Sequence, residues 1–171
     1  MKIKDFQEIN KVKGDDLDSK VRIVSILTGK SEEEVESMPI NEFLKLSKEV
    51  LTKEVSDKYQ PFIRVGARKF DAIFTMKELT AGDFIDLTHY TKDQETIINN
   101  LHKILAIFYK PRKGLFKKKL MDRDEVSELF LNELEIDVAL GYSVFFLKVW
   151  KGYIKSIKPY LEKRIRKEMS L

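Results

Sequence analysis

The stretch NNLHKILAIFYKPRKGLFKKK, residues 99–119, joins the clearest core helix of this chain to its densest run of positive charge. Its apolar residues recur at the three- and four-residue spacing of one helix face: Leu101, Ile104, Leu105 and Phe108. Pro111 cannot continue a helix and disfavours helix in the residue before it. We therefore expect a helix over residues 94–109 that ends at this proline.

The residues beyond this helix are basic: residues 110–119 include six lysines or arginines and no acid. Proline, glycine and mutually repelling lysines all oppose regular structure, so we predict a mobile basic loop over residues 110–121. Cations favour the C-terminal end of a helix dipole, but that gain of roughly 0.3–1 kcal/mol is too small to explain six of them. The surplus charge is therefore a hypothesis about binding partners.

The flanking segments mostly show helical spacing. A first helix is expected from Asp16 to Gly29, and a short helical turn opens at Ser31 and is ended by Pro39. Further helix starts are predicted at polar caps: Asn41, Thr80 with Asp83, Thr91 or Asp93, and Asp122 with Glu125. A last long helix begins near Asp137, and Pro159 predicts a kink or break in it.

One segment changes period. FIRVGARKFDAIF, residues 62–74, is rich in aromatic and β-branched residues and predicts a β-hairpin that turns near Gly66 and Ala67. The expected fold is therefore mainly α (α+β), a helical domain with one small β-hairpin near residues 62–75. A length of 171 residues without a repeat or linker predicts a single domain over residues 1–171.

Composition argues against several functional classes. There is no cysteine and only two histidines, so disulfides, thiolate chemistry and a histidine-rich zinc site are excluded. His89 and His102 have no serine or cysteine arrangement beside them that needs a base. The segment TGKS, residues 28–31, lacks the earlier glycine of a phosphate-binding loop. We expect no enzyme activity, no cofactor and no metal.

The charge of the chain is unevenly distributed although its net value is only +4. Residues 110–119 carry +6, residues 148–168 also carry +6, and the remainder therefore carries −8. This asymmetry suits DNA, acidic partner proteins or copies of the same chain. Six residues are candidates for a basic binding patch: Lys110, Arg112, Lys113, Lys117, Lys118 and Lys119.

The segment GYSVFFLKVWKGY, residues 141–153, holds more aromatic residues than one helix stripe accommodates. Some of them must lie against a second surface, either the rest of this core or another subunit. The candidate protein-binding residues are Tyr142, Phe145, Phe146, Trp150 and Tyr153. The lysines at 148 and 151 interrupt this apolar segment well before the length that a membrane span needs.

Three segments together resemble small morphogenesis proteins of tailed bacteriophages, especially tail-assembly chaperones, including those of crAss-like phages. They are SILTGKSEEEVESMPINEFLKL, NNLHKILAIFYKP and DVALGYSVFFLKVWKGYI. The first is similar in its helix, tight turn and acidic turn before a new helix. The second is similar in its helix end, and the third in its glycine-aromatic helix.

The resemblance implies a non-enzymatic assembly factor that binds tail or other virion structural proteins, or a small component of the virion itself. It would act in the host-cell cytoplasm or in the virion, as a homo-oligomer, without a membrane. The alternative is a DNA-binding or DNA-packaging accessory protein that uses the basic residues 110–119.

Overall fold

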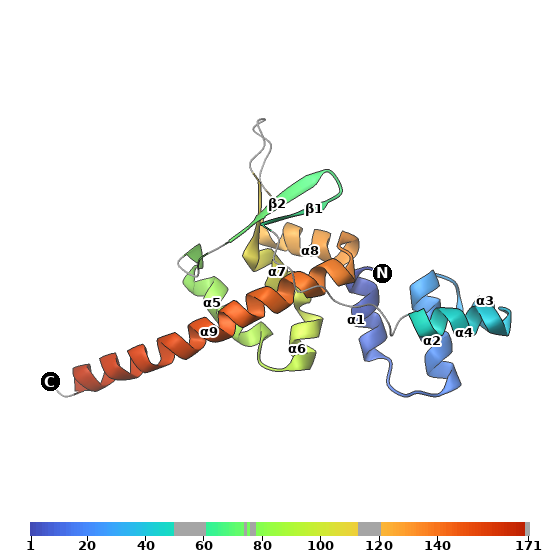
Figure 1. The fold of residues 1–171 in the computed structure, drawn as a ribbon, viewed down its shortest axis with the longest axis horizontal. Coiled ribbons are helices and arrows are strands. Elements are labelled where there is room, and N and C mark those ends of the chain that lie inside the picture. The colour runs from blue at the N-terminus through green and yellow to red at the C-terminus, as the bar shows by residue number, and fades with distance from the viewer. Residues whose placement is uncertain (50–60, 74, 76–77, 113–120, 170–171) are drawn as a thin grey trace.

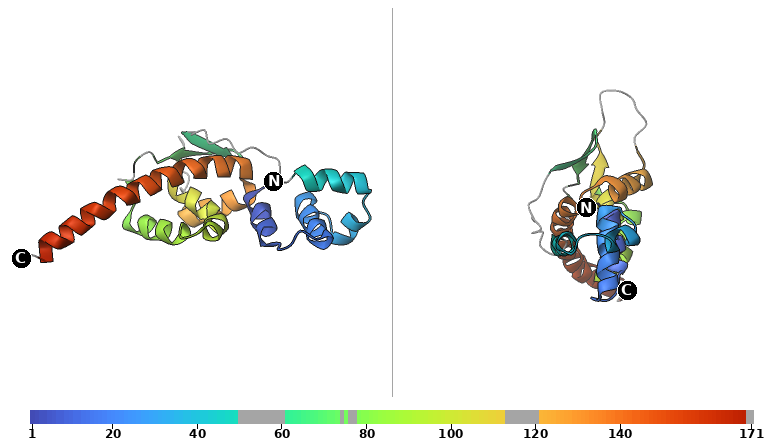
Figure 2. Two further views of the ribbon diagram at one scale, coloured as in Figure 1. Left: turned by 60° about the horizontal axis from the view of Figure 1, so that its bottom comes forward. Right: turned by 90° about the vertical axis from the view of Figure 1, so that its right-hand side faces the viewer.

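The computed structural model describes residues 1–49, 61–73, 75, 78–112 and 121–169. Within these residues the protein is mainly helical and has one small three-stranded antiparallel sheet (Figure 1). This confirms the predicted fold class. The elements form an elongated molecule, with a group of short helices at one end and a long helix projecting at the other (Figure 2).

Four helices make up the N-terminal part: α1 (Ile3–Lys11), α2 (Leu17–Thr28), α3 (Glu32–Glu36) and α4 (Ile40–Glu49). The last three share a small core of their own, formed by Val21, Val24, Val35 and Phe43. Helix α2 matches the helix predicted from Asp16 to Gly29, although α1 precedes it; Asp16 caps its start, and Gly29 at its end has a left-handed φ of +69°. The sequence gives no sign that this small core is separate from the main one.

The predicted capping box of α3 is present, because Glu34 N donates to Ser31 Oγ and Ser31 N donates to the Glu34 carboxylate. The predicted cap at Asn41 is wrong. Helix α4 begins at Ile40, directly after Pro39, so Asn41 already lies in its first turn. The Pro39 carbonyl accepts hydrogen bonds from Glu42 N and Phe43 N, so the first turn of the helix already starts from Pro39.

The sheet consists of β1 (Phe62–Val65), β2 (Arg68–Ala72) and β3 (Tyr109–Pro111), in that order. The hairpin between β1 and β2 turns at Gly66 and Ala67 as predicted, with Gly66 at a φ of +57°. Strand β3 was not predicted. It pairs antiparallel with β2, which places Tyr109 opposite Ala72.

The predicted helix over residues 94–109 is interrupted and ends earlier than expected. It is divided into α6 (Gln94–Asn99) and α7 (Leu101–Phe108). At the junction, Asn100 Nδ2 donates to the Thr96 carbonyl, 2.9 Å away, and an asparagine that binds a nearby carbonyl opposes helix continuation. Tyr109 is already extended because it pairs with Ala72 of β2. Pro111 favours extended backbone in the residue before it, Lys110.

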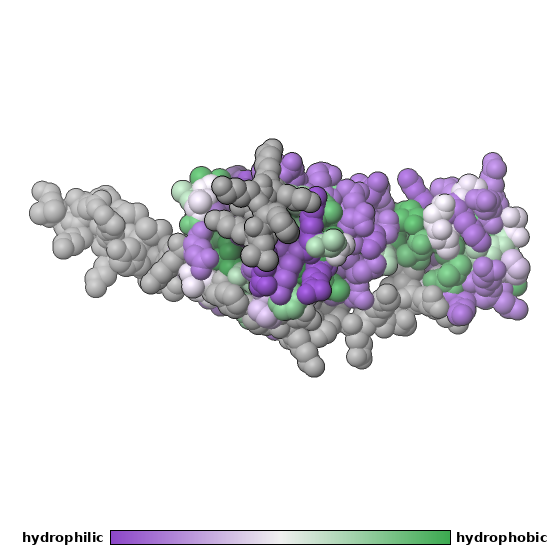
Figure 3. All heavy atoms as spheres, turned by 90° about the horizontal axis from the view of Figure 1, so that it is seen from above, coloured by the Kyte–Doolittle hydropathy of each residue, from purple (hydrophilic) through white to green (hydrophobic). Residues whose placement is uncertain are grey.

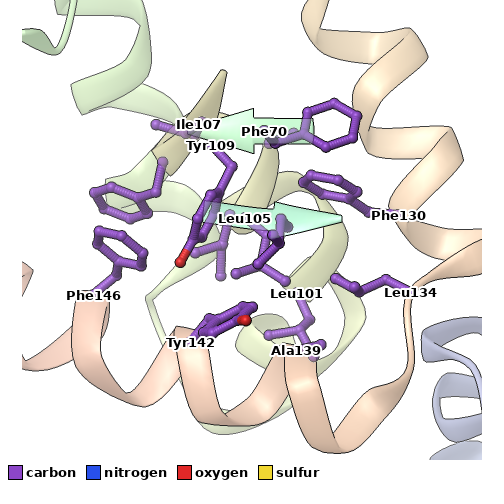
Figure 4. Packing of buried hydrophobic residues seen from close by; sticks show 14 of the residues in the cluster. Phe70, Leu101, Leu105, Ile107, Tyr109, Phe130, Leu134, Ala139, Tyr142 and Phe146 are labelled. Atoms are coloured by element: carbon purple, nitrogen blue, oxygen red, sulfur yellow. The ribbon is translucent and has the colours of Figure 1, made fainter. Parts of the chain in front are cut away.

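Helix α7 forms the centre of the main core. Seven of its eight residues are buried, and Lys103 is the exception. It packs between the sheet, α8 (Arg123–Glu133) and α9 (Ile136–Met169). In Figure 4, Tyr109, Tyr142 and Phe146 point toward one another, and the rings of Phe108 and Phe146 are stacked at 4.4 Å between centroids. On the other side, Phe70 of β2 meets Phe130 of α8 edge to face.

Helix α9 crosses the body and then extends beyond it (Figures 1 and 2). It is continuous over Ile136–Met169, so of the predicted kink or break at Pro159, the break is wrong. A proline removes one backbone hydrogen bond of a helix, and the many remaining turns of a long helix can carry that loss.

Helix α5 (Ala81–Tyr90) is attached to the body by ion pairs. Arg123, at the start of α8, donates to Asp83 at 2.9 Å and to Asp86 at 2.6 Å. Burial raises the pKa of Asp83, but hydrogen bonds from Thr80 and Arg123 and the charge of Lys110 outweigh it and hold that pKa below its usual value. The ionised carboxylate of Asp83 both caps α5 and anchors it to α8.

Candidate protein-binding cleft

A cleft of about 380 Å³ lies where α9 passes α5 and the start of α6. Side chains from all three helices and from the turn between α5 and α6 form its walls. They are Thr88, Thr91, Ile97, Leu147, Trp150, Lys151, Ile154 and Lys155.

The floor of the cleft is apolar and fixed in place. Trp150 is only 3 % exposed, and its ring meets Phe84 edge to face at 5.2 Å. Its indole Nε1 donates to Thr91 Oγ1 at 3.2 Å, and the Thr91 hydroxyl in turn donates to the Leu87 carbonyl at 2.7 Å. The tryptophan is therefore held by packing and by a hydrogen bond, as expected for an indole group that would otherwise be buried without a partner.

The α9 side of the cleft follows from helical spacing. Leu147, Trp150, Lys151, Ile154 and Lys155 recur three and four residues apart, so they lie along one strip of the helix. Leu147 and Ile154 are half-buried, whereas the two lysines are exposed. The strip thus has an apolar centre and a positively charged margin.

The two lysines place positive charge at the margin of the cleft. Neither Lys151 nor Lys155 forms an ion pair with any residue that the structure describes. On the opposite wall, Ile85 lies one helical turn before Thr88 and is 55 % exposed, which extends the apolar surface outward along α5. The cleft is therefore an apolar hollow bordered by cations.

The five aromatic candidates from the sequence are divided between core and cleft. Tyr142, Phe146 and Trp150 are buried in the main core, and only Trp150 also reaches the cleft. Phe145 and Tyr153 are half-buried and pack against that core. The aromatic excess in residues 141–153 is thus taken up mainly by the protein's own interior.

The basic candidates lie elsewhere. Lys110 and Arg112 are exposed at β3, where Lys110 is in a strand rather than in the predicted loop. The Arg112 guanidinium makes two hydrogen bonds with Asp71, one of them 2.7 Å from Nε to Oδ2. The remaining candidates lie outside the described residues: Lys113, Lys117, Lys118 and Lys119.

The cleft residues that sequence reasoning missed are of two kinds. Leu147, Lys151 and Ile154 show helical spacing with Trp150, so their common face could have been found in the sequence. Thr88 and Ile97 belong to other helices, and only the tertiary fold brings them to α9. No local pattern points to them.

The histidines are placed away from the cleft lining. His89 is exposed on α5, whereas His102 is buried in α7 with Nδ1 3.2 Å from Gln7 Nε2. Within the described part of the chain, no three histidine or carboxylate side chains come together as a possible metal site. In the same part, none of the helices has both the length and the apolar character that crossing a membrane requires.

A comparison of this chain with known protein families, with curated proteins and with solved structures finds no match in any of the three.

Proposed function

We propose that this chain is a non-enzymatic assembly factor that binds a structural protein of a tailed-phage particle through the cleft between α5, α6 and α9. The observation that carries the proposal is the apolar floor of the cleft beside the exposed positive charges of Lys151 and Lys155. The resemblance to small phage morphogenesis proteins supports the class of partner. Binding during assembly would cover apolar surface of the partner until it is incorporated.

The composition of the cleft supports a protein partner. Protein interfaces combine an apolar centre with a polar rim, and anchor side chains of one partner fill pockets of the other. A volume of about 380 Å³ is near the lower end of the range for binding pockets, roughly 300–1,000 Å³. It has room for a few side chains of a partner rather than for a whole element.

The charge of the rim defines the partner further. Lysines at the margin of an interface attract an acidic partner and accelerate its association, while the apolar floor supplies the affinity. We therefore propose that the cleft takes a segment with large apolar side chains flanked by aspartate or glutamate.

The polar groups of the cleft support binding rather than catalysis. The hydroxyls of Thr88 and Thr91 donate to the carbonyls of Phe84 and Leu87, so neither proton is directed into the cleft. A hydroxyl nucleophile needs a neighbouring base. Among the described residues that line this cleft, the only ionisable groups are Lys151 and Lys155.

Charge reversal tests the proposal. The cleft variant combines Lys151→Glu with Lys155→Glu. Its control combines Lys30→Glu with Lys45→Glu, the same change at exposed lysines in the N-terminal part of the chain. We expect the wild-type chain and the control to co-purify from infected cells with a protein that is also present in purified particles, and the cleft variant to lose it.

Equal retention of that protein by the cleft variant would contradict the proposal. Loss from both variants would show that general charge, not the cleft, determines binding. Circular dichroism of each purified variant establishes that the helices remain folded.

A further inference from the structure

The sheet has one outward face whose composition differs from that of the cleft. Strand alternation and register place six side chains on it. They are Phe62, Arg64, Lys69, Asp71, Lys110 and Arg112. Most intervening residues of the same strands are buried against the core, including Ile63 and Phe70, whereas Arg68 at the start of β2 is exposed. The sheet therefore has a mainly apolar inner face and a charged outer face.

Contacts between neighbouring strands show that these side chains share the face. Arg64 is opposite Lys69, and Asp71 is opposite Lys110. The Lys69 ammonium lies 3.4 Å from the centroid of the Phe62 ring. Arg112 joins the face beside Lys69, because Arg112 N donates to the Lys69 carbonyl at 2.8 Å. We name these six residues the basic sheet face.

The basic sheet face carries excess positive charge. It has four cations and one carboxylate, and that carboxylate, Asp71, is paired with Arg112. The other three cations, Arg64, Lys69 and Lys110, form no ion pair with any described residue. Lys110 lies near Asp83, but that carboxylate is buried and is bound by Arg123.

The cations also crowd one another. Partial burial and then the charges of Arg112 and Arg64 lower the pKa of Lys69. An anion placed over the face would relieve this repulsion. Strands are about 4.8 Å apart and alternate residues roughly 6.6 Å apart, so the cations are held in a fixed pattern by backbone hydrogen bonds.

Composition determines the class of partner. Interface cores between proteins are depleted in charged residues, and lysine is among the residues depleted there. Interfaces with nucleic acid are polar and strongly positive, and their affinity comes largely from phosphate contacts. The basic sheet face has a single aromatic ring and otherwise charged groups. Figure 3 views the molecule from the side of the sheet, where hydrophilic residues gather.

We propose that the basic sheet face binds the phosphate backbone of nucleic acid without sequence preference, at a site separate from the cleft. Arg64, Lys69 and Lys110 supply about three phosphate contacts, and Arg112 remains engaged with Asp71. The site lies on three paired strands and includes Lys110 and Arg112 of the basic segment 110–119, which the sequence offers as an alternative DNA-binding region.

The test measures binding of short, fluorescently labelled single-stranded DNA of two unrelated sequences to the full chain, between about 50 and 200 mM salt. Both sequences should bind equally, with a logarithmic salt slope near 2 for three contacts at roughly 0.7 each. Arg64→Gln, Lys69→Gln and Lys110→Gln together should weaken binding at least tenfold at low salt and remove most of that slope. Lys13→Gln, Lys30→Gln and Lys45→Gln, equally charged changes on exposed lysines, should have little effect.

A misfolded triple variant would also lose DNA binding, so a second variant that should gain binding is needed. Asp71→Asn removes the only carboxylate of the face and frees Arg112, so it should tighten DNA binding several-fold and steepen the salt slope. Unchanged or weaker binding by Asp71→Asn would overturn the proposal, as would absence of wild-type binding at low salt. An equal loss in the control triple variant would also overturn it. Polyglutamate that competes as well as DNA of equal charge would assign the face to acidic proteins instead.

Discussion

His102 is a buried titratable residue in α7, and it makes the stability of the fold depend on pH. Burial, followed by the charge of Lys103, lowers its pKa from 6.5 to about 4. Its ring is 6 % exposed, and its Nδ1 faces Gln7 Nε2. The unfolded chain therefore binds a proton at a higher pH than the folded chain does, and acidification favours unfolding.

We expect the free energy of unfolding to fall by about 2 kcal/mol between pH 7 and pH 5, and to stop responding to this group below about pH 4. Urea unfolding at the two pH values measures it. In His102→Leu this pH dependence should disappear, while Gln7 keeps its bonds to the carbonyls of Ile98 and Asn99. An unchanged slope in the variant would show that other groups cause it.

Trp150 is the residue that connects the core to the cleft. Trp150→Ala should reduce the free energy of unfolding by about 3–5 kcal/mol, because it removes a buried ring that meets Phe84. Trp150→Phe keeps an aromatic ring and loses the hydrogen bond to Thr91, so its cost should be about 1–2 kcal/mol. Denaturant unfolding distinguishes them. Full stability of the alanine variant would be incompatible with the core position of this side chain.

At the scale of elements, replacing two glycines by alanine should change the stability of the chain in opposite directions. Gly66 has a left-handed φ of +57° in the hairpin turn, so Gly66→Ala should cost about 1–2 kcal/mol. Gly152 is exposed within α9 with open space around it, so Gly152→Ala should stabilise the chain by roughly 0.5–1 kcal/mol. Thermal melts measure both. Shifts in the same direction would contradict the left-handed conformation of Gly66 or the helical position of Gly152.

The elements that could be predicted from sequence are those whose causes are local. The capping boxes at Ser31, Thr80 and Asp122 depend on residues three positions apart, and all three are present. The hairpin turn at Gly66 is equally local. Strand β3 could not be predicted in this way, because three residues after a helix become a strand only through pairing with β2.

The same distinction applies to the candidate sites. The cleft residues of α9 follow helical spacing, whereas Thr88 and Ile97 are brought to it by tertiary packing. On the sheet, Arg64 and Lys69 alternate with buried residues in the predicted hairpin, but their proximity to Lys110 depends on β3. The sequence therefore identifies the charged and aromatic segments. Contacts between elements that are distant in the sequence determine which residues of these segments lie together.

At the scale of the whole molecule, the two ends differ in charge. Helix α3 exposes Glu32, Glu33 and Glu36 at one end, near the exposed Ile40 and Leu44 of α4. Helix α5 and the part of α9 that line the basic cleft lie toward the other end, where α9 projects (Figure 1). The acidic, apolar surface of α3 and α4 is complementary to the basic, apolar cleft. We therefore expect the surface of one chain to contact the cleft of another chain. Such a contact joins unlike surfaces of identical chains and is therefore head to tail.

Homo-oligomer formation stays a prediction with a defined test. Sedimentation should show concentration-dependent association that weakens as salt rises, since screening reduces attraction between exposed charges. Lys151→Glu with Lys155→Glu should reduce the association further. A strict monomer at high protein concentration and low salt would contradict this prediction.

The central claim is that the cleft between α5, α6 and α9 holds an acidic, apolar segment of a particle protein. Incorporating a photo-crosslinking amino acid at position 154, within the cleft, and at the exposed position 22 of α2, tests it most directly. After irradiation of infected cells, mass spectrometry should find position 154 joined to a structural protein of the particle, at a segment with large apolar residues flanked by acids, and position 22 not joined to it. Crosslinks from position 154 only to unrelated host proteins, or capture of the particle protein from position 22 alone, would contradict the account.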